Sequence, residues 1–322
     1  MKDITTVGEI LIDLTQCGVN ENNIPLFSAN PGGAPANVAV AASRLGASTA
    51  FIGKVGNDCY GDFLIKTLTD NNVDTTSVVS DSISNTTLAV VSLSQKGERS
   101  FAFYRKNCAD TLLCEDEISS DILNDTHILH FGSVSLTTEP SRTATLSAVK
   151  RAKQAGATIT YDPNYRESLW ESEQTAIKQM KSAIQYADIL KISDEELPLL
   201  TGVQNLEKGT QQIFDKYGTK LILVTLGADG AFYRLGSKTG VVAGCDVKVA
   251  DTNGAGDTFF GAVLARLADE KVYAPQTLKT EQLEKIIKFA NTAAALTTSK
   301  SGAIPAMPTI DEVITKLENG GN

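Results

Sequence analysis

Histidine is scarce in this chain, and its scarcity limits the chemistry that the chain can perform. Two histidines occur among 322 residues. Both of them, His127 and His130, lie in an apolar segment that predicts a buried strand, and neither has the neighbours of a catalytic triad or the spacing of a metal site. We therefore expect both histidines to be structural, and reactions that need a catalytic histidine are disfavoured.

Cysteine and basic residues are also limited. The five cysteines are odd in number and form no C-x-x-C pair, which argues against a disulfide framework or a zinc site and fits a reducing cytoplasm. The net charge is −9 and no basic block occurs, so neither nucleic acid nor an anionic membrane is expected as a partner. Because no signal-peptide segment or membrane-spanning apolar run is present, we expect a cytoplasmic protein.

Two common nucleotide-binding motifs are missing. The chain has no G-x-G-x-x-G after its first strand, which disfavours a dinucleotide oxidoreductase, and no G-x-x-x-x-G-K-[ST], which disfavours a Walker-type NTPase. Hydrophobic residues still make up 42% of the chain and charged residues 21%. That composition supports a sizeable core, as one large α/β domain or two smaller ones.

The most informative stretch is Asp251-Thr252-Asn253-Gly254-Ala255-Gly256-Asp257. It follows the alternating segment 240–249, which predicts a strand, and precedes the apolar segment 258–267, which predicts a buried helix. A helix start presents unpaired N–H groups and partial positive charge, which suit phosphate oxygens, and its glycines allow a ligand close to the backbone. Asp257 is then either an ordinary first-turn carboxylate or a base that deprotonates a hydroxyl beside a transferring phosphoryl group.

A second glycine-rich stretch, Asn30–Gly46, predicts a Pro-Gly-Gly turn followed by a helix of alanine and valine. Asn37 is the one buried amide expected in that helix, and it either caps the turn or binds a polar ligand. Upstream, Asp13 lies near the end of a first strand at 4–14. It is either solvated or binds a sugar, because a carboxylate can accept hydrogen bonds from two neighbouring hydroxyls.

Strands and helices alternate through most of the chain, which predicts an α/β fold with a mainly parallel sheet and helices on both faces. The predicted strands are 49–54, 127–131, 157–161, 188–192 and 221–225, and the main predicted helices are 139–155, 172–186, 205–217 and 281–298. Ligands of such folds bind beyond the carboxyl ends of the strands. The polar residues expected there are Asp162, Asn164, Arg166, Ser193, Asp194, Glu195, Glu196, Thr225, Gly227, Asp229 and Gly230.

Two further segments, 86–94 and 100–104, alternate between polar and apolar residues. This pattern predicts a hairpin with one wet face outside the main sheet, with its turn at 95–98. Arg105 follows the hairpin and either reaches a substrate or forms a solvated basic corner.

The two glycine-rich stretches resemble the two signatures of the ribokinase-like sugar kinases, also called the PfkB family. Asn30–Gly46 is similar to the N-terminal glycine signature of this family, and Asp251–Asp257 with Phe259-Phe260-Gly261 is similar to the C-terminal D-T-x-G-A-G-D signature. Shorter stretches at 104–107, 161–166 and 302–305 resemble bacterial fructokinases within the family.

The resemblance implies a ribokinase-like, Rossmann-type three-layer sandwich that covers residues 1–322 as a single domain. It implies a mainly parallel sheet and a small β-sheet lid formed by about 10–28 and 86–106. It also implies transfer of the ATP γ-phosphoryl group to a sugar hydroxyl with Mg²⁺, most directly to D-fructose. An open lid edge favours a homodimer formed through the lid.

The resemblance also implies roles for individual residues. Asp257 is the general base, and the amides of Gly254, Ala255 and Gly256 form the anion hole. The sugar is held by Asp13, Gly32, Gly33, Asn37, Arg105 and Arg166. The nucleotide site is lined by Lys191, Ser193, Thr225, Gly227, Gly230 and Asn291. In place of the family N-x-x-E motif the chain has Ser193 and Glu196, so Glu196 is expected to act on Mg²⁺ indirectly, and Asp251 with the loop 299–303 matches the place of a K⁺ ion.

Two alternatives to a fructokinase remain open at this stage. The pairs Tyr104-Arg105 and Tyr165-Arg166 could grip a carboxylate, as a 2-keto-3-deoxygluconate kinase would require, because arginine binds carboxylates with two parallel hydrogen bonds. A non-catalytic sensor of sugar or nucleotide on the same scaffold is the other alternative, since a fold does not determine a function. The intact Asp257 turn argues against the sensor.

Overall fold

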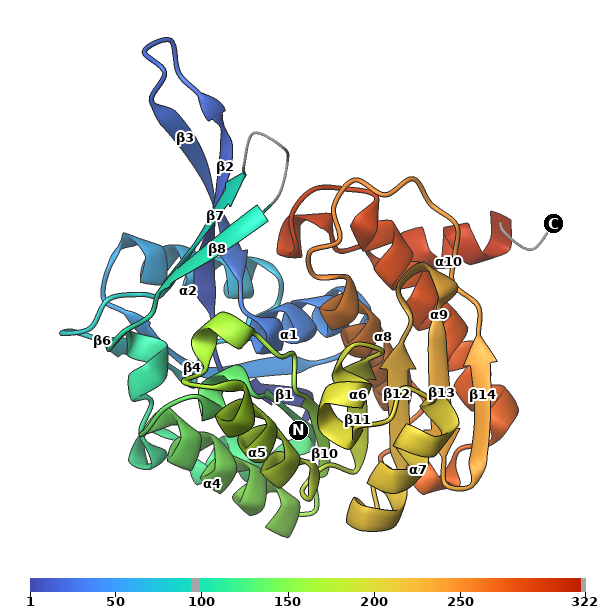
Figure 1. The fold of residues 1–322 in the computed structure, drawn as a ribbon. Coiled ribbons are helices and arrows are strands. Elements are labelled where there is room, and N and C mark those ends of the chain that lie inside the picture. Colours follow the sequence, from blue (N-terminus) through green and yellow to red (C-terminus); the bar gives the residue numbers. More distant parts are fainter. Residues whose placement is uncertain (94–98, 320–322) are drawn as a thin grey trace.

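A large sheet built mainly from parallel strands forms the centre of the molecule (Figure 1). We describe it from a computed structural model, which describes residues 1–93 and 99–319. The strand order is β14-β13-β12-β11-β10-β9-β1-β4-β5, and β6 also pairs with β4. The strands are β1 (Lys2–Val7), β4 (Thr49–Gly56), β5 (Val73–Asp74), β6 (Val78–Asp81), β9 (Thr126–Gly132), β10 (Thr158–Asp162), β11 (Ile189–Ser193), β12 (Leu221–Thr225), β13 (Ala231–Leu235) and β14 (Lys238–Val242). All neighbours are parallel except β12–β13 and β13–β14.

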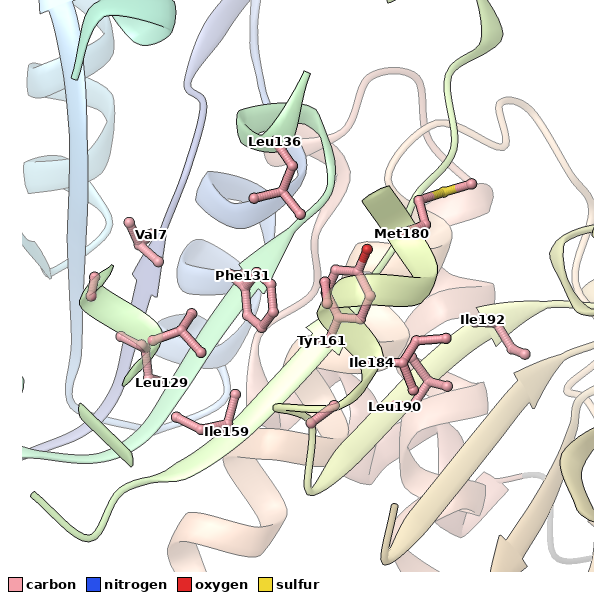
Figure 2. Packing of buried hydrophobic residues seen from close by; sticks show 14 of the residues in the cluster. Val7, Leu129, Phe131, Leu136, Ile159, Tyr161, Met180, Ile184, Leu190 and Ile192 are labelled. Atoms are coloured by element: carbon pink, nitrogen blue, oxygen red, sulfur yellow. The ribbon is translucent and has the colours of Figure 1, made fainter. Parts of the chain in front are cut away.

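Helices cover both faces of this sheet, as the alternation of strands and helices predicts (Figure 1). Neighbouring strand residues belong to different clusters: Leu129 and Leu190 pack with α4 and α5, whereas Ile128 and Ile189 pack with α1, α8 and α9. Figure 2 shows Leu129 and Leu190 within the first cluster. The period of two along each strand therefore produces the three layers. The helices are α1 (Ala34–Arg44), α2 (Cys59–Asp70), α3 (Ser120–Asn124), α4 (Ser141–Gln154), α5 (Glu173–Ile184), α6 (Glu196–Thr201), α7 (Leu206–Tyr217), α8 (Ala255–Asp269), α9 (Thr280–Thr298) and α10 (Ile310–Asn319).

Both histidines are part of this framework, as predicted. His130 is buried in β9, where its Nδ1 atom lies 3.2 Å from the hydroxyl of Thr160, and burial lowers its pKa to about 3. His127 stacks on the ring of Tyr273. Within the described ranges, none of the helices has the length and apolar character that crossing a membrane requires.

A second, four-stranded sheet projects from the main body at the upper left of Figure 1. Its order is β3-β2-β7-β8, from strands β2 (Leu11–Val19), β3 (Pro25–Gly32), β7 (Leu88–Leu93) and β8 (Arg99–Tyr104). We call this sheet the lid. The predicted hairpin turn at 95–98 lies outside the described residues.

Three details of the prediction were wrong. The predicted first strand 4–14 is two strands in different sheets, β1 in the main sheet and β2 in the lid. The segment 30–32 belongs to the lid strand β3 instead of a tight turn, because its backbone pairs with β2; the chain turns at Gly33, which has a φ of 108°. The predicted strand at 240–249 ends at Val242, and most of that segment is a loop. The loop leads from β14 to α8.

Close packing between α1 and α8 joins the two glycine-rich stretches. A Cβ atom on Gly261 would lie 2.7 Å from the Cβ atom of Ala41 and 2.9 Å from the carbonyl oxygen of Val38. One turn earlier in each helix lie Asp257 and Asn37, whose side chains are hydrogen-bonded to each other. The small residues at this crossing thus bring the two polar side chains together.

Replacing Gly261 with alanine should lower the free energy of unfolding by about 1–3 kcal/mol, because the new methyl group meets backbone atoms that can move only with α1. Chemical denaturation measures this change. Gly209→Ala is the matched control: the three atoms nearest to its Cβ atom would all belong to the side chain of Leu197, at 2.9–3.0 Å, and this side chain can rotate away. An equal loss in the free energy of unfolding for both variants would contradict the prediction that the close contact of α1 and α8 requires glycine at position 261.

Candidate active site

The predicted site residues gather at the carboxyl edge of the parallel strands. Asp162, Ser193 and Thr225 are the last residues of β10, β11 and β12, which are consecutive neighbours in the sheet. The N-terminus of α8 and the lid strand β2 contribute further side chains to this edge. The convergence expected from the alternating pattern is therefore present.

The turn before α8 has the geometry of an anion site. Gly254 is the N-terminal cap of this helix, has a φ of 75°, and no side chain caps the first turn. A Cβ atom on Gly254 would lie 2.7 Å from the side chain of Ala303, so that both the backbone angle and the packing require glycine. The Ala255 amide makes a long, 3.4 Å bond to the Thr252 carbonyl. Because no side chain caps this helix start, its amides are suited to a ligand.

Asp257 lies in this first turn and is 9% exposed. Its Oδ2 atom accepts a 2.8 Å hydrogen bond from Nδ2 of Asn37, and its Oδ1 atom lies 3.5 Å from Nδ2 of Asn164. Burial raises the pKa of Asp257, and the Asn37 bond together with the charges of Lys191 and Arg166 opposes that rise. Asp257 is therefore a positioned carboxylate of raised proton affinity, which suits a general base.

The sequence left two alternatives for Asn37, capping the turn or binding a polar ligand; the capping alternative is wrong, and ligand binding stays a prediction. Its amide nitrogen holds Asp257, while its Oδ1 atom is buried and has no hydrogen-bond partner among the described residues. A buried carbonyl oxygen without a partner costs free energy, so this atom is ready to accept a hydrogen bond from a ligand.

Asp13 reaches the same place from the lid strand β2. A Cβ atom on Gly32 would lie 2.5 Å from Oδ2 of Asp13, so glycine in the neighbouring strand β3 makes room for this carboxylate. Burial raises the pKa of Asp13 to about 6; a hydrogen bond from Asn253 and the charge of Arg166 lower it, and the charge of Asp257 raises it. Asp13, Arg166 and Asp257 thus lie close enough to influence one another.

Ser193 and Glu196 hold each other at the end of β11. Oε2 of Glu196 accepts from the Ser193 amide at 2.8 Å, Oγ of Ser193 accepts from the Glu196 amide at 3.1 Å, and Oε1 of Glu196 accepts from the Tyr165 amide at 2.7 Å. This reciprocal arrangement fixes the orientation of Glu196 at the start of α6. The serine hydroxyl keeps its own proton for donation to a ligand.

Four residues predicted for the nucleotide site lie along neighbouring loops. Thr225 ends β12, and Gly227 and Gly230 bound a short turn with φ angles of 58° and 101°. A Cβ atom on Gly230 would lie 2.2 Å from the Val242 carbonyl oxygen, so the turn packs directly on the end of β14. Asn291 donates to that same carbonyl at 3.0 Å, and it therefore holds this loop from α9.

Arg105 is buried beside the lid instead of lying exposed at its corner. Its guanidinium group donates to Oδ2 of Asp110 at 2.7 Å, to the Thr137 hydroxyl at 2.6 Å and to the Val134 carbonyl at 3.1 Å. These bonds connect the end of β8 to the main body. The solvated alternative is wrong, and a role for Arg105 in binding sugar stays a prediction.

Asp251 connects the turn before α8 with the loop 299–303. Its Oδ1 atom accepts from the Asn253 amide at 3.0 Å and its Oδ2 atom from the Gly302 amide at 3.1 Å. The amides of Ala250 and Asp251 both donate to the Thr298 carbonyl. Across the described segments, no group of three or more histidine, cysteine or acidic side chains could hold a metal ion.

Asn164, which the strand pattern predicts at this edge, approaches Asp257. Two other contributing residues were missed as site residues. Asn253, the variable member of the D-T-x-G-A-G-D turn, contacts Asp13. Glu9 is buried, its Oε1 atom accepts from the Ala34 amide at 3.1 Å, and burial raises its pKa to about 7. A carboxylate that interrupts an apolar run was the available signal for Glu9, whereas the contact between distant segments left no signal for Asn253.

Comparisons with known proteins agree with this geometry. Residues 1–310 match the description "pfkB family carbohydrate kinase". The chain is 45% identical to fructokinase-1 of Zea mays over 318 residues, which covers 98% of this chain and 97% of the relative. The chain belongs to the pfkB family of carbohydrate kinases.

Among solved structures, fructokinases have the same fold as this chain. Fructokinase with bound ATP from Xylella fastidiosa superposes with a TM-score of 0.93 at 32% identity, covering 100% of both chains. A double mutant of fructokinase from Vibrio cholerae O395, with bound fructose, ADP and a potassium ion, has a TM-score of 0.87 at 36% identity and covers 98% of this chain and 97% of that one. The similar proteins named here are all fructokinases.

Proposed function

We propose that this chain is an ATP-dependent fructokinase, which converts ATP and D-fructose into ADP and D-fructose 6-phosphate. The observation that carries the proposal is the buried Asp257, held by Asn37 in the first turn of α8 beside an uncapped helix start. The relatives that bind or are named for fructose support the choice of sugar.

In the proposed reaction, Asp257 takes the proton of the 6-hydroxyl group as that oxygen forms a bond to the γ-phosphorus atom. The bond from this phosphorus atom to the oxygen that bridges it to ADP breaks, and ADP leaves with the bonding electrons. The amides of Gly254, Ala255 and Gly256 face the charge on the transferring group. Little covalent chemistry is left for the protein beyond positioning and electrostatic stabilisation.

The sugar would lie between the lid and α1. Asp13 offers two carboxylate oxygens to neighbouring hydroxyls, and the unpartnered Oδ1 of Asn37 offers one further acceptor. Gly32 makes room for the Asp13 carboxylate, and Gly33 lets the backbone pack against Glu9 and Ile10 at the end of β3, beside the proposed sugar site. Closure of the lid over the sugar would exclude water and limit hydrolysis of ATP.

ATP with its Mg²⁺ would lie along the carboxyl edge of β11 and β12. Mg²⁺ usually retains several waters, and Glu196 is suited to hold one of them. Two amide bonds fix its carboxylate in position, and each oxygen can accept a further hydrogen bond. The hydroxyl groups of Ser193 and Thr225 would donate to phosphate, and Gly227, Gly230 and Asn291 would border the nucleotide. When bound with ATP, Mg²⁺ would neutralise part of the negative charge of the phosphates.

A potassium ion belongs to the proposal because the Vibrio cholerae structure contains one. The joined loops at Asp251 and 299–303 suit such an ion, since they bring the Asp251 carboxylate to the Gly302 amide and the Thr298 carbonyl to the Asp251 amide. Activity that rises when Na⁺ is replaced by K⁺ would support it.

We further propose a cytoplasmic homodimer in which each chain is one kinase domain, residues 1–322. The lid hairpin exposes four apolar side chains, with exposed fractions of 43–57%: Val19, Ile24, Leu26 and Phe27. Together with the open edge of β3, this surface suits a second lid. A light-scattering mass of one chain at micromolar concentration would remove the dimer from the proposal.

A 2-keto-3-deoxygluconate kinase is the second candidate function. The charge of Arg166 acts on both Asp13 and Asp257, so a substrate carboxylate beside them would find a cationic partner. A non-catalytic sensor fits less well, because a sensor does not require a buried carboxylate whose proton affinity is raised at the phosphate turn.

ADP release tests these alternatives directly. The assay contains ATP, Mg²⁺ and one substrate from the panel of fructose, glucose, ribose, 2-keto-3-deoxygluconate and fructose 6-phosphate. The proposal requires that fructose has the highest kcat/KM by at least about tenfold. A higher value for the keto acid would select the second function, and no turnover with any substrate would favour the sensor.

A further inference from the structure

Lys191 is a buried cation directly beneath the phosphate turn. It stands on β11 and is 6% exposed. Its Nζ atom forms a 2.8 Å ion pair with Oδ2 of Asp162, whose side chain is 2% exposed. A Cβ atom on Gly256 would lie 3.0 Å from the same Nζ atom, so the ammonium group fills the space below the second residue of α8.

The charges around this ammonium group are unbalanced. Three carboxylates, those of Asp162, Glu196 and Asp257, act on it, and each comes from a different element. Burial tends to lower the pKa of Lys191, but the three carboxylates outweigh burial and raise it. His130, the remaining titratable neighbour, stays neutral since burial and Lys191 both lower its pKa. Lys191 is therefore a permanent cation.

The ion pair with Asp162 does not explain the position of Lys191 by itself. A buried pair gains little stability over apolar residues of similar volume, because both charges lose their hydration. The pair is placed where the anionic phosphoryl group and Asp257 must approach one sugar oxygen. Burial and the negative charge of the phosphates both raise the proton affinity of Asp257 at this place. A fixed positive charge nearby lowers it again.

We propose that Lys191 is a positioning residue that keeps Asp257 ionised and places a fixed positive charge beneath the turn at residues 254–256. This inference rests on the proposed kinase function and adds a role to it: Lys191 acts through Asp257 and the Gly256 amide, with no contact to the sugar. Asp162 holds the ammonium group in place beneath the turn.

The groups that face Asp257 determine the pH readout. They are Asn37 on α1, Asp162 at the end of β10, Asn164 and Arg166 in the loop that follows, Lys191 on β11 and Asp13 on the lid. Lys191 is the buried cation among them, and removing it should raise the pH at which Asp257 loses its proton. A merely structural lysine would lower activity by the same factor at every pH.

The test compares Asp162→Asn with the double variant Asp162→Asn/Lys191→Met. The double variant removes both charges of the Lys191–Asp162 pair together, so it is expected to fold, and the two proteins differ only at Lys191. Relative to Asp162→Asn, the double variant should lose about 10–100-fold in kcat at pH 7, and the acid limb of kcat should move up by about one pH unit or more. The KM for fructose should change less than threefold, because Lys191 does not touch the sugar.

Lys191→Arg separates charge from fit, since it retains the cation in a larger side chain. It should keep the acid limb at the wild-type pH even where kcat falls. An unmoved acid limb in the double variant, or a loss equal at all pH values, would overturn the proposal. The wild-type enzyme is measured in the same assay: if it lacks turnover with fructose, the proposed function fails first, and Lys191 is then tested with the sugar that the panel identifies.

Discussion

Asp257→Asn should lower kcat for fructose by a factor of about 10²–10⁴, the usual contribution of a general base. The substitution keeps the shape of the side chain and an oxygen that can accept the 2.8 Å bond from Asn37, but removes the ability to take a proton. Binding of fructose and of ATP should stay nearly unchanged, because the carboxylate acts on the hydroxyl proton in the transition state. Steady-state kinetics and calorimetric titration with both substrates measure the two quantities.

The Asp257 variant should be as stable as the wild type or more stable at neutral pH. Burial raises the pKa of Asp257, so the ionised carboxylate opposes folding, and the neutral amide removes that cost. Asp269→Asn, at the exposed end of the same helix, is the matched control and should retain activity. Near-normal turnover of the Asp257 variant would exclude Asp257 as the base.

Asp13→Asn should raise the KM for fructose by about 30–300-fold, because two charge-assisted hydrogen bonds to hydroxyl groups are weakened. The KM for ATP should change little, since Asp13 is carried by the lid strand β2. Glu21→Gln, an exposed acid in the same hairpin, serves as the control. An unchanged fructose KM would remove Asp13 from the sugar site.

The pH dependence of this effect follows from the pKa of Asp13, which burial raises to about 6. Sugar binding needs the ionised form, so kcat/KM for fructose should decline as the pH falls through about 6, and the Asn variant should lack this part of the profile. Stability has the opposite sign. The folded state holds the Asp13 proton more tightly than the unfolded state. The free energy of unfolding of the wild type therefore decreases as the pH rises from about 4 to about 6, whereas the Asn variant avoids this loss.

How far the site could be predicted depends on the distance between the groups involved. Within Gly254–Asp257, the chemistry is local: glycines, an uncapped helix start and a first-turn carboxylate are adjacent in the chain, and the structure has them as predicted. The strand ends at Asp162, Ser193 and Thr225 could be predicted for a similar reason, since parallel strands place their carboxyl ends on one edge.

The contacts between segments could not be predicted in the same way. Whether Asn37 caps a turn or meets a carboxylate depends on the crossing of α1 and α8, which Gly261 and Ala41 allow. Arg105 follows the lid hairpin in the chain, but its direction is determined by Asp110 and Thr137, with which it is buried. A polar side chain in a sequence does not indicate which distant partner satisfies it.

The sequence by itself determined the α/β class, the turn at Gly254–Asp257 and the family, because these depend on periodicity and on motifs whose residues are neighbours in the chain. Only the tertiary structure decided that Lys191 underlies Gly256, that Asn253 contacts Asp13, and that Glu9 is buried. The physical reason is that the electrostatic state of a buried group depends on the charges and hydrogen bonds that folding brings around it from distant segments.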